Sequence, residues 1–169
     1  SEHVWWVGAI DWGLRDFHGY STERGSTYNA YLVMGEYPVL IDTAKAPFRD
    51  EMLARVASVT DPANVKVIVS HHAEMDHSGS LPQVIDIIKP DKVYASQMGV
   101  QNLAAQLHHN HQITPVKDAE TLSLGGLGFI VVAGELDCRD ADRDGRPGVE
   151  FSWQGSDEGD DVSGRGWAD

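Results

Sequence analysis

Residues 65–69 read Val-Lys-Val-Ile-Val, and residues 70–79 continue as Ser-His-His-Ala-Glu-Met-Asp-His-Ser-Gly. The first run predicts a buried strand. The second gathers four side chains that can bind a metal: His72, Glu74, Asp76 and His77. In an extended chain residues i, i+2 and i+4 share one side, so the first three are expected to converge, with His77 joining if the chain turns. Imidazoles and carboxylates are costly to bury together without a cation, so the spacing favours a metal site over a solvated polar loop.

The overall composition is that of a globular chain. Its 169 residues are 41% hydrophobic and 23% charged, which suits one domain with a real core. We see no signal peptide and no apolar run near the length of a membrane span, and expect no membrane partner. The single cysteine, Cys138, excludes a disulfide framework within the chain and fits a reducing cytoplasm. A net charge of -13 argues against nucleic-acid binding.

Residues 1–133 have the patterns of a layered α/β domain. Helices are expected at 47–59, 81–88 and 98–108, with Pro47 and Pro82 in first turns and Ser80 as an N-cap. Residues 14–25 are expected to form a polar loop. Strand patterns occupy residues 3–13, 28–33, 38–43, 65–69, 92–95, 113–116, 121–124 and 127–132.

The composition changes near Gly134. Residues 134–169 carry 11 acidic and 4 basic side chains and 7 of the 17 glycines, without periodicity, so an acidic disordered tail is expected. Residues 140–145, Asp-Ala-Asp-Arg-Asp-Gly, imitate the start of a calcium loop. The position of the final bidentate Glu is taken by Phe151, however, so calcium binding is not the expectation.

The chemistry of the four donors favours iron. Zinc hydrolases prefer His-rich ligand sets, whereas Glu74 makes this set richer in oxygen donors, which suits iron or manganese. Two metals can share such a loop if a bridging carboxylate arrives from elsewhere. An iron pair permits dioxygen or nitric oxide chemistry, and a zinc pair would activate water for hydrolysis.

The string His72-x-Glu74-x-Asp76-His77, followed by Ser-Gly-Ser, resembles the iron-binding motif of the flavodiiron proteins, which have the metallo-β-lactamase fold. Other segments are similar to the same family: residues 7–12, 15–20, 25–32, 40–43 and 118–122. The resemblance implies an αββα sandwich. Residues 1–133 would form only the N-terminal part of its diiron domain, so the sandwich would be incomplete.

Members of that family reduce dioxygen to water, or nitric oxide to nitrous oxide, at a non-haem diiron centre. Electrons reach the two irons through FMN in a flavodoxin-like domain, often from rubredoxin, within a head-to-tail homodimer. The resemblance therefore implies a cytoplasmic oxidoreductase with rubredoxin or a similar donor as partner. It does not distinguish dioxygen from nitric oxide as the substrate.

The resemblance also implies roles for single residues. His72 and Glu74 would ligate one iron, and Asp76 and His77 the other, although in some members the residue matching His77 is turned away. His18 and Tyr20 lie in a segment similar to the family's pocket-lining region, with simple loop packing as the equal alternative. Asp42 would orient the metal loop from behind, or merely cap a turn.

The chain departs from the family after residue 132. The family next supplies a His in a His-Trp-Pro-Asp-Ser-like segment, a bridging Asp and a final His, but here no His follows His111. Asp137, Asp140 and Asp142 occupy the general region without matching the motif, and the flavodoxin-like domain that would bind FMN is absent. A frameshift, a truncation and a fragment completed by another chain are the explanations left open.

Two other functions stay open. One is a zinc-dependent hydrolase with zinc at His72, Asp76 and His77, against which Glu74 argues. The other is an inactive fragment that acts only through association, mediated by its acidic tail. The cluster of His108, His109 and His111 is interpreted as a solvated helix end rather than a metal site.

Overall fold

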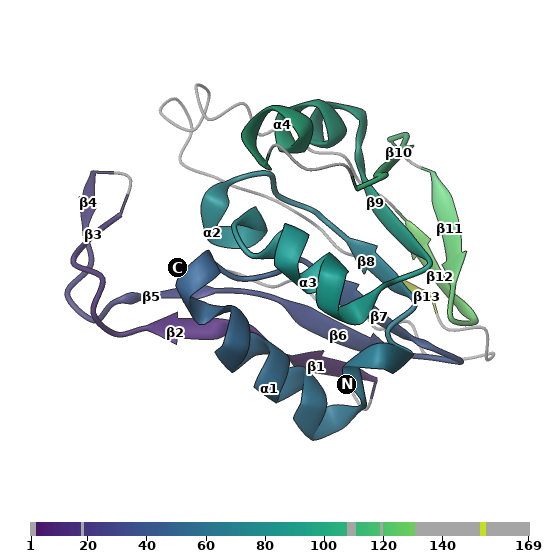
Figure 1. Cartoon of the computed structure of the whole chain (residues 1–169), viewed down its shortest axis with the longest axis horizontal. Helices are drawn as coiled ribbons and strands as arrows, with labels where there is room; N and C mark the ends of the chain where they lie inside the picture. Colours follow the sequence, from purple (N-terminus) through teal and green to yellow (C-terminus); the bar gives the residue numbers. More distant parts are fainter. Residues whose placement is uncertain (1–2, 18, 108–110, 119, 131–152, 155–169) are drawn as a thin grey trace.

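The computed structural model describes residues 3–17, 19–107, 111–118, 120–130 and 153–154 (Figure 1). Its centre is a six-stranded sheet in the order β1-β6-β7-β8-β9-β10. The first three of these strands are antiparallel neighbours, and the pairs from β7 to β10 are parallel. The strands are β1 (Val4–Trp6), β6 (Tyr31–Met34), β7 (Pro38–Ile41), β8 (Val67–Val69), β9 (Lys92–Ser96) and β10 (Thr114–Val116).

Helices cross over between the parallel strands and cover one face of this sheet (Figure 1). Helix α3 shows why: Leu81, Val84, Ile85 and Ile88 recur at helical spacing and are all buried. They share a core with Leu40 and other sheet residues and with buried side chains of α1 and α4. The helices are η1 (Ala46–Phe48), α1 (Arg49–Val59), η2 (Pro62–Asn64), α2 (Met75–Ser78), α3 (Leu81–Ile88) and α4 (Gln97–Leu107).

The opposite face carries a smaller antiparallel sheet of β11 (Thr121–Leu124), β12 (Leu127–Ile130) and β13 (Trp153–Gln154). Leu124 packs there against Val39, Ile41 and Val67, whereas Leu40 points to the helices, as the period of two along a strand requires. The described ranges therefore form three layers: helices, the large sheet and the small sheet.

A separate ribbon leads away from the large sheet. Strands β2 (Ala9–Asp11) and β5 (Ser26–Tyr28) pair with each other and continue into a short hairpin of β3 (Asp16–Phe17) and β4 (Tyr20–Ser21). The hairpin projects from the body of the molecule at the left of Figure 1. Residues 14–25, expected as a plain loop, thus contain two short strands.

The helices and strands predicted from the sequence are found in the structure, but several of them begin or end at other residues than predicted. Residues 3–13 form two strands instead of one. The break falls at Val7 and Gly8, and the Val7 N–H donates to the carbonyl of Ala30 at 2.8 Å. Ser80 precedes α3 as expected, but its hydroxyl does not cap the helix; it donates to the carbonyl of Ala44 at 2.6 Å. The tail expected to be disordered, with its calcium-loop resemblance, lies outside the described residues except for β13.

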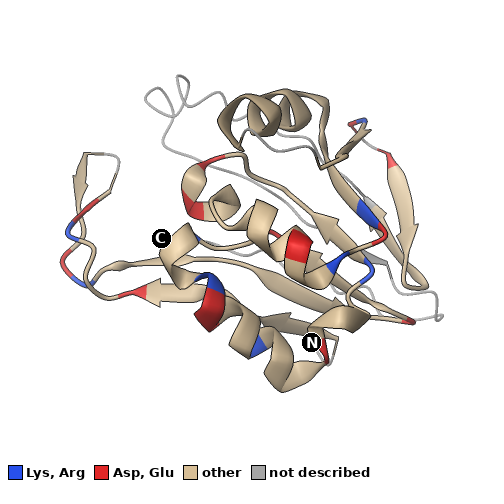
Figure 2. Ribbon diagram, viewed as in Figure 1, with Lys and Arg blue, Asp and Glu red and all other residues tan. Residues whose placement is uncertain are grey.

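Charged residues are spread over the described elements. In Figure 2 the Lys and Arg positions do not gather into one basic stripe, in keeping with the expectation that the chain does not bind nucleic acid, which stays a prediction. No helix in the described ranges has the length and apolar character needed to cross a membrane.

Candidate metal centre

The candidate site begins where two parallel strands leave the sheet side by side. Ile41 at the end of β7 pairs with Val69 at the end of β8, so the residues that follow both strands emerge at one edge. The Asp42 N–H donates to the Val69 carbonyl at 2.8 Å, and the Ser70 N–H donates to the carbonyl of Tyr94 in β9 at 2.7 Å. This edge, at the carboxyl ends of the strands, is where ligands commonly bind in open α/β sheets.

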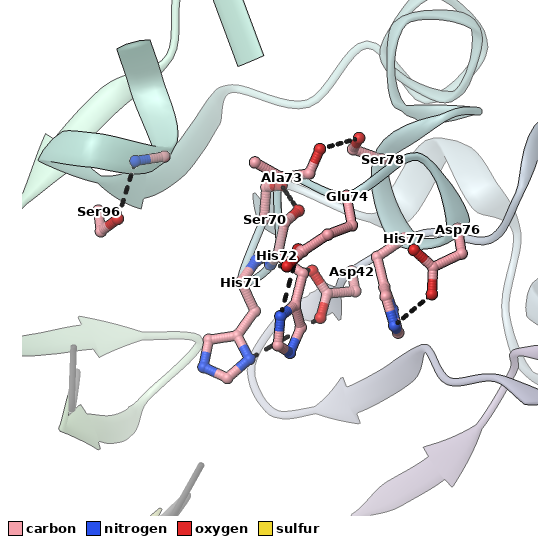
Figure 3. A network of polar contacts seen from close by, with 11 residues as sticks. Asp42, Ser70, His71, His72, Ala73, Glu74, Asp76, His77, Ser78 and Ser96 are labelled. Atoms are coloured by element: carbon pink, nitrogen blue, oxygen red, sulfur yellow. Dashed lines mark hydrogen bonds and ion pairs between the residues drawn. The ribbon is translucent and has the colours of Figure 1, made fainter. Parts of the chain in front are cut away.

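Asp42 joins the end of β7 to the loop that follows β8. Its backbone has φ = 57°, a left-handed conformation that non-glycine residues rarely adopt. One carboxylate oxygen, Oδ1, accepts hydrogen bonds from the backbone N–H groups of His71 at 2.6 Å and His72 at 3.2 Å (Figure 3). The contact fits the orienting role expected of Asp42, which stays a prediction.

Buried hydroxyl groups fasten the rest of the loop. The Thr43 Oγ1 donates to the carbonyl of His77 at 2.5 Å, and the Thr43 N–H donates to the same oxygen at 3.1 Å. The Ser78 hydroxyl donates to the Ala73 carbonyl at 2.7 Å (Figure 3). Thr43 follows β7, and Ser78 belongs to the loop and to α2. Hydrogen bonds from both sides therefore hold the loop in its conformation.

The loop does not stay extended, so the expectation of an i, i+2, i+4 face was wrong. Glu74 has extended backbone angles, and the chain then turns into the short helix α2, which carries Asp76 and His77. The donors consequently form neighbouring pairs. His72 Nδ1 lies 3.6 Å from Glu74 Oε2, and His77 Nε2 lies 3.3 Å from Asp76 Oδ2 (Figure 3). The two pairs are adjacent because the imidazole rings of His72 and His77 are 4.8 Å apart.

A further histidine, His71, also lies at the site. One possible donor atom each from Asp42, His71 and His72 falls within 4.8 Å of the others. Sequence reasoning did not choose His71, because neighbours in an extended chain point to opposite sides. The adjacent pair of histidines was the only signal that could have found it.

Burial and neighbouring charges set the protonation of these groups. Burial raises the pKa of Asp42 to about 6, although the nearby histidines and the two backbone N–H groups act in the other direction. Burial, reinforced by His72 and His77, lowers the pKa of His71 to about 4. The Glu74 carboxylate, as hydrogen-bond acceptor for the His72 ring, raises the pKa of His72 in spite of burial. At neutral pH, His71 is therefore an uncharged imidazole.

The donor set fits a metal. The Nδ1 atom of His77 is buried and has no hydrogen-bond partner among the described residues, an arrangement that usually costs free energy and that a metal ion would remedy. Imidazole and carboxylate together suit iron better than either a thiolate set or an oxygen-only set. The site therefore has the chemistry of a mixed nitrogen and oxygen metal centre.

The other residues singled out in the sequence lie elsewhere. Tyr20 is 71% exposed on β4, in the projecting hairpin, away from α2 (Figure 1). Its neighbour His18 lies outside the described residues, as do His108, His109, Asp137, Asp140 and Asp142. The pocket-lining role expected for His18 and Tyr20 stays a prediction.

Known proteins resemble this chain over most of its length. The rubredoxin-oxygen oxidoreductase of Megalodesulfovibrio gigas is 46% identical over 121 residues, which are 70% of this chain and 30% of that protein. The nitric oxide reductase of Moorella thermoacetica is 37% identical over 135 residues, 77% of this chain and 34% of that protein. This chain thus spans about a third of the length of these curated relatives. A comparison with models of known protein families found no match.

Solved structures also resemble this chain. The rubredoxin oxygen:oxidoreductase of the anaerobe Desulfovibrio gigas aligns with a TM-score of 0.72 and 42% identity, covering 77% of this chain and 33% of that one. The flavodiiron protein of Giardia intestinalis aligns with a TM-score of 0.70 and 32% identity, covering 77% and 32%. A subclass B3 metallo-β-lactamase of Bradyrhizobium japonicum, at a TM-score of 0.54 and 18% identity over 62% of this chain and 45% of that one, shares the fold alone. The expected metallo-β-lactamase-like fold is confirmed.

Proposed function

Because this chain belongs to the flavodiiron proteins, as the N-terminal part of their metallo-β-lactamase-like domain, we propose that it supplies part of an iron centre that reduces dioxygen or nitric oxide. The observation that carries the proposal is the pairing of donors on the loop after β8. Two mixed pairs, His72 with Glu74 and Asp76 with His77, lie side by side on a loop that the protein itself holds in place.

Each pair would hold one iron. His72 and Glu74 would bind the first and Asp76 and His77 the second. Bound iron would hold the gas and pass on to it the electrons that a reduced flavin donor supplies. The protein's part is to position these donors before the metal arrives, through Asp42 at the start of the loop and Thr43 at His77.

Metal binding at this site should depend on pH. The pKa of His72 is raised by Glu74, so in the metal-free chain this imidazole holds its proton more firmly than an ordinary histidine. A metal ion must displace that proton to bind, and affinity should therefore rise as the pH rises past the ordinary histidine range.

The same proposal includes an electron donor and partners. The names of the relatives include rubredoxin, oxygen and nitric oxide, so we propose a rubredoxin-type donor and either gas as substrate. FMN and the remaining iron ligands would come from further sequence or from a second chain, because none of the 169 residues matches the family's later motifs. A homodimer and a cytoplasmic location are part of the proposal.

The proposal can be tested with the intact chain. After anaerobic loading with ferrous iron and addition of reduced FMN, an electrode should record slow, iron-dependent consumption of dioxygen or nitric oxide. We expect slow turnover because the later ligands are missing. The His72→Ala variant should lose the activity and the His111→Gln variant should keep it, since His111 forms an ion pair with Asp86 of α3. Equal rates in His72→Ala and the wild type would overturn the proposal.

The same protein distinguishes the hydrolase alternative. The zinc-loaded chain should not cleave a β-lactam, an ester or a thioester if the iron function is right. Cleavage that depends on zinc and on His72, with no gas consumption by the iron-loaded chain, would replace the proposed oxidoreductase with a hydrolase.

A further inference from the structure

We propose that Met75 is a site of iron-directed oxidation, at which hydrogen peroxide converts the thioether of the side chain to the sulfoxide. The inference rests on the part of the proposed function that places iron on the loop at residues 70–79. It does not require the chain to complete the reduction of dioxygen or of nitric oxide.

Met75 lies between the two donor pairs. It follows Glu74 and precedes Asp76, and it is the first residue of α2. Consecutive Cα atoms are about 3.8 Å apart, so the backbone of Met75 is next to a carboxylate donor of each pair. The Gly79 N–H donates to the Met75 carbonyl at 3.0 Å, which holds the main chain in this position. Peroxide drawn to either pair is therefore brought close to this residue.

The side chain of Met75 is open to solvent. Its exposed fraction is 52%, whereas only 14% of the Asp76 side chain and 19% of the His77 side chain are exposed. Methionine is unbranched, with three rotatable bonds and a polarizable sulfur, so this side chain has the freedom to swing toward either pair. A thioether that peroxide can reach is a common site of oxidation.

The four methionines of the chain provide an internal scale. Met52 is fully buried and Met34 is half-buried. Met98 is 54% exposed, nearly the same fraction as Met75, but it lies on α4 between Gln and Gly instead of between metal donors. Ser96, two residues before it, lies apart from the donors in Figure 3. Exposure alone therefore predicts equal oxidation of Met75 and Met98, and only iron on the loop distinguishes them.

The reaction is a two-electron oxidation of sulfur. A lone pair of the Met75 sulfur attacks one oxygen of hydrogen peroxide, so that a sulfur–oxygen bond forms while the oxygen–oxygen bond breaks. The other oxygen leaves as hydroxide and takes the proton from the new sulfur-bound hydroxyl, which gives water and the sulfoxide. Hydrogen peroxide is the product when dioxygen receives two electrons and two protons instead of four of each. A bound metal ion promotes the attack by polarising an oxygen of the peroxide.

The test adds hydrogen peroxide to the intact chain after anaerobic loading with ferrous iron and removal of unbound iron by dialysis. Peptide mass spectrometry then follows the gain of one oxygen atom at each methionine. We expect Met75 to be oxidised faster than Met98 by about tenfold or more, a small part of what proximity can supply. In the metal-free chain the two rates should be similar.

Two variants serve as controls for the position of the iron. His72→Ala removes a donor of the first pair and should reduce the preference for Met75. His111→Gln removes a histidine that pairs with Asp86 of α3 and should preserve it. Met75→Leu replaces the thioether with a side chain of similar size and should retain as much iron as the wild type, because the sulfur is not a donor.

Equal rates for Met75 and Met98 in a chain that has retained iron would overturn the inference. An equal preference for Met75 in the metal-free chain would do the same, and so would a loss of iron in Met75→Leu, which would make the sulfur a ligand. Selective oxidation of Met75 without any gas consumption would refute the proposed reductase and leave this inference standing. A wild-type chain that retains no iron would refute both. Iron retention and oxidation are measured separately, so the two failures are distinguishable.

Discussion

The Asp42 carboxylate accepts a hydrogen bond from the backbone N–H of His71 at 2.6 Å, which ties the end of β7 to the first residues of the metal loop after β8. The Asp42 carboxyl group is buried and the His71 imidazole is partly buried, and the pKa of the first is raised while that of the second is lowered. The two side chains should therefore make the free energy of unfolding of the metal-free chain depend on pH. Substituting one of them at a time should separate their contributions.

Asp42 should destabilise the metal-free chain as the pH rises. Its pKa is about 6 in the folded chain against an ordinary value of 3.8, so between these values the folded state binds more protons than the unfolded state. Its contribution to stability is full below the ordinary value and is lost as the pH rises to the folded value. Asp42→Asn keeps an oxygen acceptor without the charge. By urea unfolding, the stability of this variant relative to wild type should increase across this window, by up to about 3 kcal/mol.

His71 should have the opposite effect. Its pKa is about 4 in the folded chain against 6.5, so between these values the folded state binds fewer protons than the unfolded state. Its contribution is present above the ordinary value and is lost as the pH falls toward the folded value. Relative to wild type, His71→Gln should therefore lose stability as the pH rises, by up to about 3 kcal/mol. Slopes of the same sign for His71→Gln and Asp42→Asn would contradict this account.

Thr43 should fasten the loop through its hydroxyl. Thr43 is 1% exposed, and its Oγ1 donates to the His77 carbonyl at 2.5 Å. Thr43→Val keeps the shape and removes the donor, which should cost about 1–2 kcal/mol in the free energy of unfolding. Thr43→Ser retains the hydroxyl and should lose less. A Thr43→Val variant as stable as the wild type would show that this hydrogen bond does not stabilise the loop.

Gly79 should not tolerate a side chain. A Cβ at Gly79 would lie 2.4 Å from the Met75 carbonyl oxygen and 3.3 Å from the Ala46 backbone nitrogen, so the backbone itself would have to move. Gly79→Ala should destabilise the chain by about 1–3 kcal/mol, the range for an overpacked site. At Gly13 the nearest atom would be a side-chain oxygen of Asp11 at 3.5 Å, so Gly13→Ala serves as the control. Thermal unfolding of the two variants gives the comparison, and similar melting temperatures would refute the prediction.

Local patterns predicted much of the fold. The apolar spacing of α3 and the apolar runs of β7 and β8 indicate their elements directly, because each buries one face or both. The strand predicted at residues 65–69 is also found, as β8 (Val67–Val69), before the loop that carries His72 and Glu74. What the local pattern could not predict was the helical turn at Met75, since it is held by Thr43, 34 positions from His77 in the sequence.

Two features of the site have no local signature. Asp42 has a left-handed backbone, and its N–H donates to the carbonyl of Val69, which is distant in the sequence. The residues beside Asp42 in the sequence do not indicate this conformation. His71 becomes a neighbour of Asp42 only because its own N–H is bound by that carboxylate. Long-range hydrogen bonds of this kind decide which side chains share the site, and periodicity carries no information about them.

The most direct test of the metal centre is the amount of ferrous iron that the intact chain retains after anaerobic equilibrium dialysis. We predict that the wild-type chain and His111→Gln retain iron, and that His72→Ala, which removes a donor of the first iron pair, retains clearly less. A wild-type chain that retains no iron, or a His72→Ala variant that retains as much as the wild type, would contradict the assignment of the loop at residues 70–79 as a metal site.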